Sequence, residues 1–364
     1  MAAGGVVPAI SFSLMIAAVA GSGAALRSPS PPRRPNILLL LTDDQDIELG
    51  SMAAMPFARE RLVKAGTRLS NFFAHTPVCC PSRSELLSGR YFQNIRVATA
   101  ADKGCMRVNV TDSFHNATLA VPLQRAGYTT ALFGKYLNGG GPKYLCPTAN
   151  KTSGGEGMPA PFRPRGWDRF FGMCPDDCYE DCLFVDDGIG KRFNDKNFAN
   201  GSNYATSVIG NATVQWLSTA LRRQQENSPV PASPIFAYIA PHAPHTAPAG
   251  QSMVAPWYTH SFANADVRAP RTAAYGVAAP DHHWLVATQP ELTFPVKLEL
   301  DILALMRWQA LLSVEDILRE VFAVVEEYDA MERTFFIYTS DHGKVAKRAC
   351  CAMIRTAHRR AYSD

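Results

Sequence analysis

Three apolar segments of this sequence each end in side chains that can bind a cation or move a proton. Each run has the length and composition of a buried β-strand, and the polar residues follow it directly. These residues are Asp43 and Asp44 after Asn36–Thr42, His242 and His245 after Ser233–Ala240, and Asp341 and His342 after Thr334–Thr339. In open α/β sheets ligands bind at the carboxyl ends of strands, so we expect these side chains to converge on one site.

The adjacent carboxylates Asp43 and Asp44 repel each other and lose hydration at the end of a buried strand. A divalent cation resolves both problems, and hard oxygen ligands favour calcium or magnesium over zinc. A helix N-cap or an Asx turn is the alternative role for this pair. The second acidic strand end, at Asp341, favours the metal site.

A candidate nucleophile, Cys79, stands just before a predicted helix. Pro81 and Gly89 predict a helix over Cys80–Ser88, because Pro is favoured in the first turn of a helix and Gly just past its end. A helix N-terminus offers free N–H groups and positive potential to an anion. The alternative is a buried structural cysteine pair, Cys79 and Cys80.

The elements that must position these residues alternate between strands and helices. Periodicity predicts a further strand over Tyr128–Phe133, whereas Gly250–Pro295, rich in Ala, Pro and His, is predicted to form loops. The predicted helices are Met55–Ala65, Cys80–Ser88, Leu119–Ala126, Tyr204–Gln225 and most of Val296–Glu332. This alternation indicates an α/β sandwich with a largely parallel sheet.

The composition is that of an ordinary globular protein, with 364 residues, 47% hydrophobic and 19% charged. It excludes a disordered chain, a collagen and a coiled coil. The net charge is +4, but the last 21 residues carry +5 and everything before them sums to −1. The body of the chain therefore does not have the charge of a nucleic-acid-binding protein.

The N-terminal sequence indicates export. Residues 1–25 are expected to be a cleaved signal peptide, and residues 26–35 a Pro-rich linker. A membrane anchor is the alternative, but the apolar run is short for a spanning helix, and no later stretch is long and apolar enough to cross a bilayer. Five N-glycosylation sequons agree with a secretory protein, lysosomal or secreted. They begin at Asn109, Asn116, Asn150, Asn200 and Asn211.

Nine cysteines suit an oxidising compartment, and their odd number leaves at least one unpaired. Cys174, Cys178 and Cys182 recur at every fourth position among acidic residues. Disulfides in an acidic surface loop are the favoured interpretation, and a zinc site is the alternative.

The segment around Cys79 resembles the signature of the formylglycine-dependent sulfatases. That signature is C-x-P-S-R followed by a Gly-Arg pair, and here it is met by Cys79, Pro81, Ser82 and Arg83, with Gly89-Arg90 after them. The resemblance implies that a formylglycine-generating enzyme oxidises Cys79 to formylglycine, the covalent nucleophile, and that Arg83 orients its hydrate. Cys80 fails the pattern, because Ser82 and Ser84 stand where Pro and Arg are required.

A second sulfatase signature, G-Y-x-T-x-x-x-G-K, runs from Gly127 to Lys135. In the family this lysine contacts the sulfate, which implies the same role for Lys135; a surface lysine at a strand end is the alternative. Many sulfatases place a histidine two residues later, where this sequence has Leu137. The Lys-Tyr-Leu-Asn variant is similar to the N-acetylglucosamine-6-sulfatase and heparan endosulfatase branch, whose local pattern algal arylsulfatases share.

The resemblance also assigns the strand-end residues. Ala240 to Pro244 resembles the A-P-H-S-P of glucosamine-6-sulfatases, which implies that His242 protonates the leaving alcohol or binds the ester oxygen, with His245 as second choice. One calcium ion is implied, and its implied ligands are Asp43, Asp44, Cys79, Asp341 and His342. Looser likeness to this branch extends to His283–Leu285 and Arg307–Asp316.

The resemblance covers residues 36–343 and implies an alkaline-phosphatase-like α/β sandwich. Residues 344–364 form a divergent basic tail in place of the family's C-terminal subdomain, so we expect this chain to be incomplete and impaired as an enzyme. A misjoined reading frame is the favoured explanation of the tail, and a polyanion-binding tail is the alternative.

The implied activity is hydrolysis of sulfate esters, with 6-O-sulfated N-acetylglucosamine of glycosaminoglycans as the expected substrate. Arylsulfatase or extracellular endosulfatase activity is the alternative, as is a non-catalytic sulfatase-like glycoprotein. A metallohydrolase of phosphate esters is disfavoured, because it would use Thr or Ser in place of Cys79.

Overall fold

The computed structural model describes residues 34–45, 47, 50–96, 112–138, 163–174, 178–193, 203–226, 232–248, 251–271 and 275–343. The residues from Arg34 onward belong to one compact unit. The predicted signal peptide, nearly all of the linker and the basic tail lie outside the described residues, as do Asn109, Asn150 and Asn200. The other two glycosylation candidates, Asn116 and Asn211, are exposed to solvent.

The described residues form a seven-stranded mixed sheet with the strand order β5-β4-β3-β2-β6-β1-β7. Strands β3, β2, β6, β1 and β7 run parallel to one another, β4 pairs antiparallel with β3, and β5 pairs antiparallel with β4 at the edge of the sheet. The largely parallel sheet predicted from the sequence is therefore confirmed. The strand bounds are β1 Asn36–Thr42, β2 Thr129–Gly134, β3 Arg169–Cys174, β4 Leu183–Asp186, β5 Ile189–Arg192, β6 Ile235–Ala240 and β7 Thr334–Ser340.

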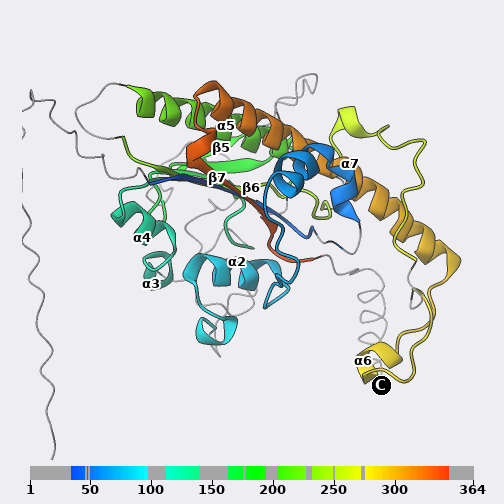
Figure 1. Cartoon of the computed structure of the whole chain (residues 1–364). Helices are drawn as coiled ribbons and strands as arrows, with labels where there is room; N and C mark the ends of the chain where they lie inside the picture. Colours follow the sequence, from blue (N-terminus) through cyan, green and yellow to red (C-terminus); the bar gives the residue numbers. More distant parts are fainter. Residues whose placement is uncertain are drawn as a thin grey trace, which may run out of the picture. The chain divides into compact units, whose positions relative to one another are not determined.

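Helices cover both faces of this sheet, with α5 and α7 on one face and α2, α3 and α4 on the other (Figure 1). The longer helices are α2 Cys79–Ser88, α4 Ala120–Arg125, α5 Ala205–Gln225 and α7 Phe294–Glu327. The short helical segments are η1 Ser51–Ala54, α1 Pro56–Ala58, the π-helical turn η2 Arg59–Lys64, η3 Phe92–Asn94, α3 Asp112–His115, η6 Pro256–Tyr258, α6 Trp284–Ala287 and η7 Met331–Arg333.

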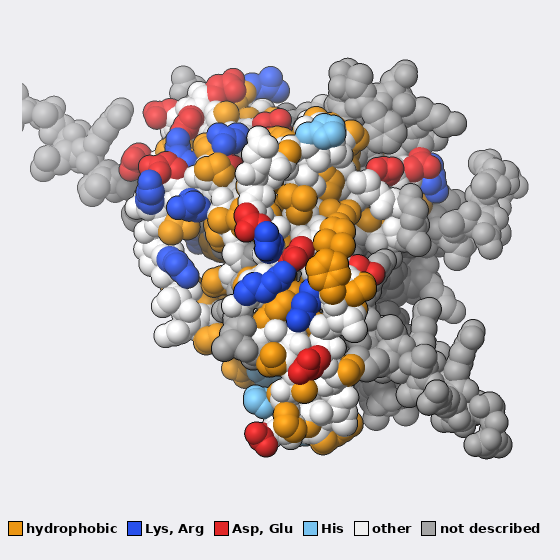
Figure 2. Space-filling model, turned by 90° about the vertical axis from the view of Figure 1, so that its right-hand side faces the viewer, with side chains coloured by type: hydrophobic (Ala, Val, Ile, Leu, Met, Phe, Trp, Pro, Cys, Tyr) orange, Lys and Arg blue, Asp and Glu red, His pale blue; other side chains and the backbone are white. Residues whose placement is uncertain are grey.

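Strand β1 is apolar from Ile37 to Leu41, and both of its faces are covered by helices. Leu38 and Leu40 pack into a core cluster with α5 and α7, whereas Leu39 and Leu41 pack into a second cluster with α2 and α4. The two clusters hold the sheet between its helical layers and fix where the strand ends emerge. On the face in Figure 2, Lys and Arg side chains are interspersed with Asp and Glu, so that face carries no extended field of one sign.

Several parts of the fold differ from the sequence-based expectations. Strand β3 was not predicted, and the short helices η6 and α6 lie in Gly250–Pro295, which was expected to form loops. The helix predicted over Met55–Ala65 is a short α-helical turn followed by the π-helical turn η2. The hairpin β4–β5 was not predicted, although Asp187-Gly188 is a known two-residue hairpin signal; both residues have positive φ, 48° and 96°. Among the described helices, none combines the length and apolar character that a membrane span requires.

Candidate active site

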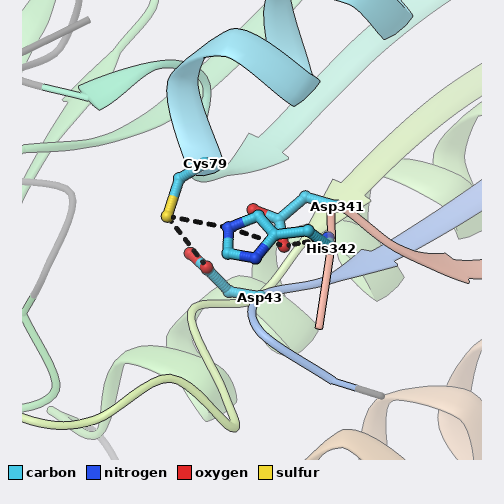
Figure 3. Close-up of side chains that lie close together, drawn as sticks. All are labelled: Asp43, Cys79, Asp341 and His342. Atoms are coloured by element: carbon cyan, nitrogen blue, oxygen red, sulfur yellow. Dashed lines mark hydrogen bonds and ion pairs between the residues drawn. The ribbon is translucent and has the colours of Figure 1, made fainter. Parts of the chain in front are cut away.

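The ends of β1, β6 and β7 bring the predicted site residues together. These three strands are adjacent in the sheet, with β1 between β6 and β7, so their carboxyl ends open onto one region. Helix α2 begins there, and its first residue is Cys79, one position earlier than predicted. The side chains of Asp43, Asp341 and His342 surround the Cys79 thiol (Figure 3).

Cys79 lies at the centre of the cluster and is 7% exposed. Its Sγ lies 3.7 Å from Asp43 Oδ1 and 3.3 Å from His342 Nε2. Asp341 Oδ1 accepts a hydrogen bond of 3.0 Å from the backbone N–H of Asp44, which ties the ends of β7 and β1 together. Burial and the nearby Asp43 carboxylate raise the pKa of the Cys79 thiol to about 12.

Two buried cations neutralise the carboxylates. Lys135 Nζ lies 2.5 Å from Asp43 Oδ2, and Arg83 Nε donates to Asp341 Oδ2 at 2.9 Å. Burial alone would raise the pKa of Asp43, but Lys135 and Arg83 hold that pKa well below its ordinary value. For Asp341, burial and the Asp43 charge prevail and raise the pKa. Lys135 and Arg83 therefore supply a fixed positive potential beside Cys79 rather than exposed surface charges.

Both candidate histidines of the loop after β6 reach the site. His242 is fully buried, with Nδ1 3.4 Å from Asp43 Oδ2, and His245 Nε2 lies 3.5 Å from Asp44 Oδ2. Burial lowers the pKa of His242 to about 4, so its imidazole is neutral near pH 7. The two ring centroids lie 4.5 Å apart. The structure therefore places both candidates, His242 and the second choice His245, at the site.

Arg307 of α7 contacts the site in a way that the sequence pattern did not reveal. This side chain is 1% exposed, and it donates hydrogen bonds to the carbonyl oxygens of Asp44 at 2.6 Å and Pro244 at 3.0 Å. Arg307 thus joins the acidic loop after β1 to the histidine loop after β6. In the sequence, Arg307 lies in a segment that resembles the family, but no role was predicted for it. Its contacts depend on how α7 packs against these loops in the folded protein, which the local sequence does not specify.

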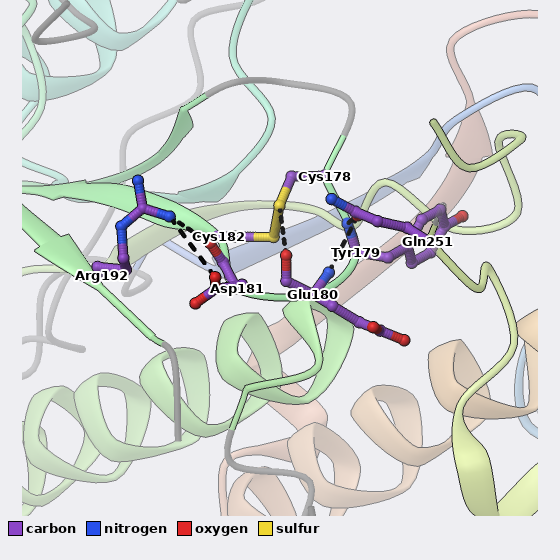
Figure 4. Close-up of a disulfide and its surroundings, with 7 residues drawn as sticks. All are labelled: Cys178, Tyr179, Glu180, Asp181, Cys182, Arg192 and Gln251. Carbon is purple, nitrogen blue, oxygen red and sulfur yellow. Dashed lines mark hydrogen bonds and ion pairs between the residues drawn. A yellow bond between two sulfur atoms is a disulfide. The ribbon is translucent and has the colours of Figure 1, made fainter. Parts of the chain in front are cut away.

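Tyr179 is the second residue that the sequence did not single out. Its hydroxyl donates to the carbonyl of His245 at 2.6 Å, and its ring centroid lies 4.9 Å from that of His242. The disulfide between Cys178 and Cys182 closes the turn that carries Tyr179 (Figure 4). The expected disulfide is present, but the expected surface location is wrong, because both cysteines are buried.

The neighbouring residues Cys79 and Cys80 differ in their bonding state. Among the described cysteines, Cys79 carries a free thiol, whereas Cys80 and Cys174 are disulfide-bonded. Cys80 packs in the core cluster on the α2 side of the sheet. A structural pair of Cys79 with Cys80 is therefore wrong for this structure.

The residues at the strand ends fit a divalent cation. One ligand atom each from Asp43, Cys79, Asp341 and His342 lies within 4.8 Å of the others, and all four residues are buried. Asp44 lies against this group, with Oδ1 3.4 Å from His342 Nε2, at a backbone φ of 63°. Buried carboxylates that share so small a volume repel one another, and a divalent cation would balance their charge together with Lys135 and Arg83.

The known proteins that this chain resembles in sequence are sulfatases. The sulfatase family profile matches residues 35–350, and the chain belongs to the sulfatase family. It is 31% identical over 316 residues to the Drosophila melanogaster extracellular sulfatase SULF-1 homolog (85% of this chain, 25% of that one). It is 28% identical over 344 residues to human N-acetylglucosamine-6-sulfatase (92% and 56%). The chain therefore spans at most about half the length of these curated relatives.

A solved structure determined in complex with D-glucosamine-2-N,6-O-disulfate, its substrate, has the same fold. The TM-score is 0.53 at 18% identity, with 85% of this chain and 66% of that chain covered. The alkaline-phosphatase-like α/β fold expected from the sequence is thereby confirmed, as is the resemblance to the N-acetylglucosamine-6-sulfatase and extracellular sulfatase branch.

Proposed function

We propose that this chain hydrolyses sulfate esters, with Cys79 converted to formylglycine and a divalent cation, calcium, bound beside it. The observation that carries the proposal is the burial of Cys79 at the start of α2, against Asp43 and His342 and within reach of Lys135 and Arg83. The positive potential around residue 79 would stabilise an anionic group transferred onto it, and such surroundings differ from those of an exposed cysteine.

Residue 79 is proposed to react as an aldehyde hydrate rather than as a thiolate. Burial and Asp43 raise the pKa of the thiol, so the unmodified side chain is a weak nucleophile at neutral pH. Formylglycine supplies two hydroxyls on one carbon, of which one attacks sulfur and the other allows sulfate to leave without attack by water. The proposal therefore requires a formylglycine-generating enzyme as a partner during maturation.

The charged side chains of the site are proposed to bind and polarise the sulfuryl group. Lys135 is 1% exposed and Arg83 is fully buried, so their charges act in a low-dielectric environment where they are fixed before substrate arrives. The N-terminal N–H groups of α2 add to this potential. Asp43, Asp44, Asp341 and His342 are proposed to hold the cation, which would draw charge from the sulfate oxygens.

His242 is proposed to move the proton of the reaction. Its ring is neutral, and Nδ1 lies 3.4 Å from Asp43 Oδ2, so the carboxylate favours the ring proton on Nδ1. Neither ring nitrogen makes a hydrogen bond among the described residues, and Nε2, the nitrogen away from Asp43, is proposed to take up a proton and return it to the departing alcohol. His245 and the Tyr179 ring pack against His242 and keep this orientation.

The proposed substrate is a 6-O-sulfated N-acetylglucosamine unit of a glycosaminoglycan. Similarity to N-acetylglucosamine-6-sulfatase and to an extracellular sulfatase supports this class, as does the fold shared with a protein solved with a glucosamine disulfate. Arylsulfatase or endosulfatase action is the alternative. The same relatives support a chain that travels the secretory pathway to the lysosome or the cell exterior.

The test compares turnover of N-acetylglucosamine 6-sulfate with that of a chromogenic aryl sulfate, using full-length chain secreted by cells that carry the modifying enzyme. We expect both esters to be cleaved, the sugar more efficiently, and both activities to disappear in Cys79→Ala. Activity confined to the aryl ester would contradict the amino-sugar assignment, and equal activity of Cys79→Ala would contradict the mechanism. His75→Asn is the matched control, because His75 is an exposed histidine outside the site.

A further inference from the structure

The cluster at the strand ends contains softer donors than an oxygen-only calcium site. Cys79 contributes sulfur and His342 an imidazole nitrogen, beside the carboxylates of Asp43 and Asp341. Thiolate and imidazole ligands favour zinc, whereas calcium and magnesium favour oxygen. One sulfur, one nitrogen and two carboxylate oxygens make a four-donor set of the kind that zinc accepts.

Three of the distances between these donors are close to those of a tetrahedral zinc site. With Zn–S of about 2.3 Å and Zn–N or Zn–O of about 2.0–2.2 Å, tetrahedral angles place the ligand atoms roughly 3.3–3.6 Å apart. Three separations of the cluster are 3.3 Å (Cys79 Sγ to His342 Nε2), 3.7 Å (Cys79 Sγ to Asp43 Oδ1) and 3.9 Å (His342 Nε2 to Asp341 Oδ1). The first lies at the lower end of that range and the other two lie slightly above it, so the donors need only small side-chain rotations to enclose an ion. The four side chains point toward one another (Figure 3).

Hydrogen bonds outside the cluster already orient these ligands. His342 Nδ1 lies 2.7 Å from the carbonyl oxygen of Gly343, which holds the ring proton on Nδ1 and points the lone pair of Nε2 at Cys79. A zinc-bound histidine characteristically makes such a bond with its second nitrogen. Arg83 and Lys135 bind Oδ2 of Asp341 and Asp43, respectively. Asp43 Oδ1 lies against Cys79. Asp341 Oδ1 lies against His342 Nε2 and is held there by hydrogen bonds that it accepts from the backbone N–H groups of Asp44 at 3.0 Å and His342 at 2.8 Å.

We propose that the unmodified chain, with Cys79 still a cysteine, is a zinc-binding protein whose ligands are Cys79 Sγ, His342 Nε2, Asp43 Oδ1 and Asp341 Oδ1. The thiol proton leaves to solvent when the metal binds. Conversion of Cys79 to formylglycine replaces the sulfur with oxygen, so the modification changes the metal preference of the site from zinc to calcium or magnesium. Zinc binding by the thiol form stands without the proposed sulfatase activity, whereas the change of preference rests on that conversion.

The test measures metal binding by full-length chain from cells that lack the modifying enzyme, with Zn²⁺ and Ca²⁺ alone as probes. We expect one Zn²⁺ per chain by elemental analysis and competition with a chelating indicator. We expect affinity at least 100-fold weaker in Cys79→Ser and at least 10-fold weaker in His342→Asn. Bound Zn²⁺ should also protect Cys79 from alkylation by iodoacetamide. His75→Asn should bind Zn²⁺ like the parent chain.

Cobalt substitution keeps the proposal falsifiable if the variants fold poorly. Co²⁺ bound to the parent thiol form should give a thiolate-to-metal charge-transfer absorption that disappears when Zn²⁺ is added. Absence of that absorption, or equal Zn²⁺ affinity in the thiol form and Cys79→Ser, would overturn the zinc site. In converted chain we expect the order of Zn²⁺ and Ca²⁺ affinities to reverse. Tight Zn²⁺ binding that survives conversion would overturn the change of preference while leaving the zinc site and the sulfatase activity to stand.

Discussion

Replacing Arg307 with Met is predicted to loosen the loops after β1 and β6 at once. Arg307 is buried on α7 and donates to the carbonyl oxygens of Asp44 and Pro244. Methionine fills a similar volume but cannot donate a hydrogen bond, so two buried carbonyls lose a charged donor. Asp44 and the turn that holds His242 should then move independently.

The magnitude follows from the two lost bonds. A hydrogen bond from a charged donor contributes about 1.5–3 kcal/mol, so Arg307→Met should lower the free energy of unfolding by about 3–6 kcal/mol. At roughly 2 °C per kcal/mol for a chain of this size, the melting temperature should fall by roughly 6–12 °C. Arg307→Lys keeps the charge and one donor group, and it should recover part of that loss.

The assay combines thermal melting with sulfate release at a temperature where every variant is folded. Arg319→Met is the matched control, because Arg319 lies on the same helix with a side chain 52% exposed and pairs with Glu315 at 3.3 Å; its cost should stay below about 1 kcal/mol. A folded Arg307→Met with unaltered melting temperature, turnover and Ca²⁺ affinity would refute the reasoning.

Three further predictions concern other parts of the site. Tyr179→Phe removes the bond to the His245 carbonyl, so melting should show a loss of about 1 kcal/mol and turnover should fall several-fold; unchanged turnover would refute a positioning role. Gly134→Ala should abolish soluble folded protein, because Gly134 has φ +98° and a Cβ would lie 2.2 Å from the Ala240 oxygen; a normal melting curve would contradict the β2–β6 register. Removal of the cation by a chelator should stop sulfate release by the chain that carries formylglycine, and added Ca²⁺ should restore that activity. Sulfate release that persists in the presence of the chelator would exclude the cation from the reaction.

Much of the site could be predicted because strand ends are encoded locally. The apolar run Asn36–Thr42 and the acidic pair after it are adjacent in sequence, and the parallel sheet alone brings Asp43 near Asp341. The helix that begins at Cys79 is likewise fixed by its own Pro and Gly. These features depend on short-range patterns, so one sequence suffices to predict them.

The residues that were missed act through long-range contacts. Arg307 reaches Asp44 across 263 positions of sequence, and Tyr179 reaches His245 across 66. Neither side chain belongs to a motif whose spacing reveals its partner, because the contact depends on how α7 and the disulfide-closed turn dock against the loops. The β4–β5 hairpin was missed for a different reason: its Asp-Gly turn was visible, but the flanking strands are only four residues long.

The central claim is that residue 79 reacts as formylglycine, and it is tested by relating conversion to activity. Preparations made with graded amounts of the modifying enzyme should be analysed by mass spectrometry of the peptide that contains Cys79 and by turnover of N-acetylglucosamine 6-sulfate. The account predicts that turnover rises in proportion to the converted fraction and extrapolates to zero for fully unmodified chain. Full turnover by chain whose Cys79 remains entirely a thiol would contradict it.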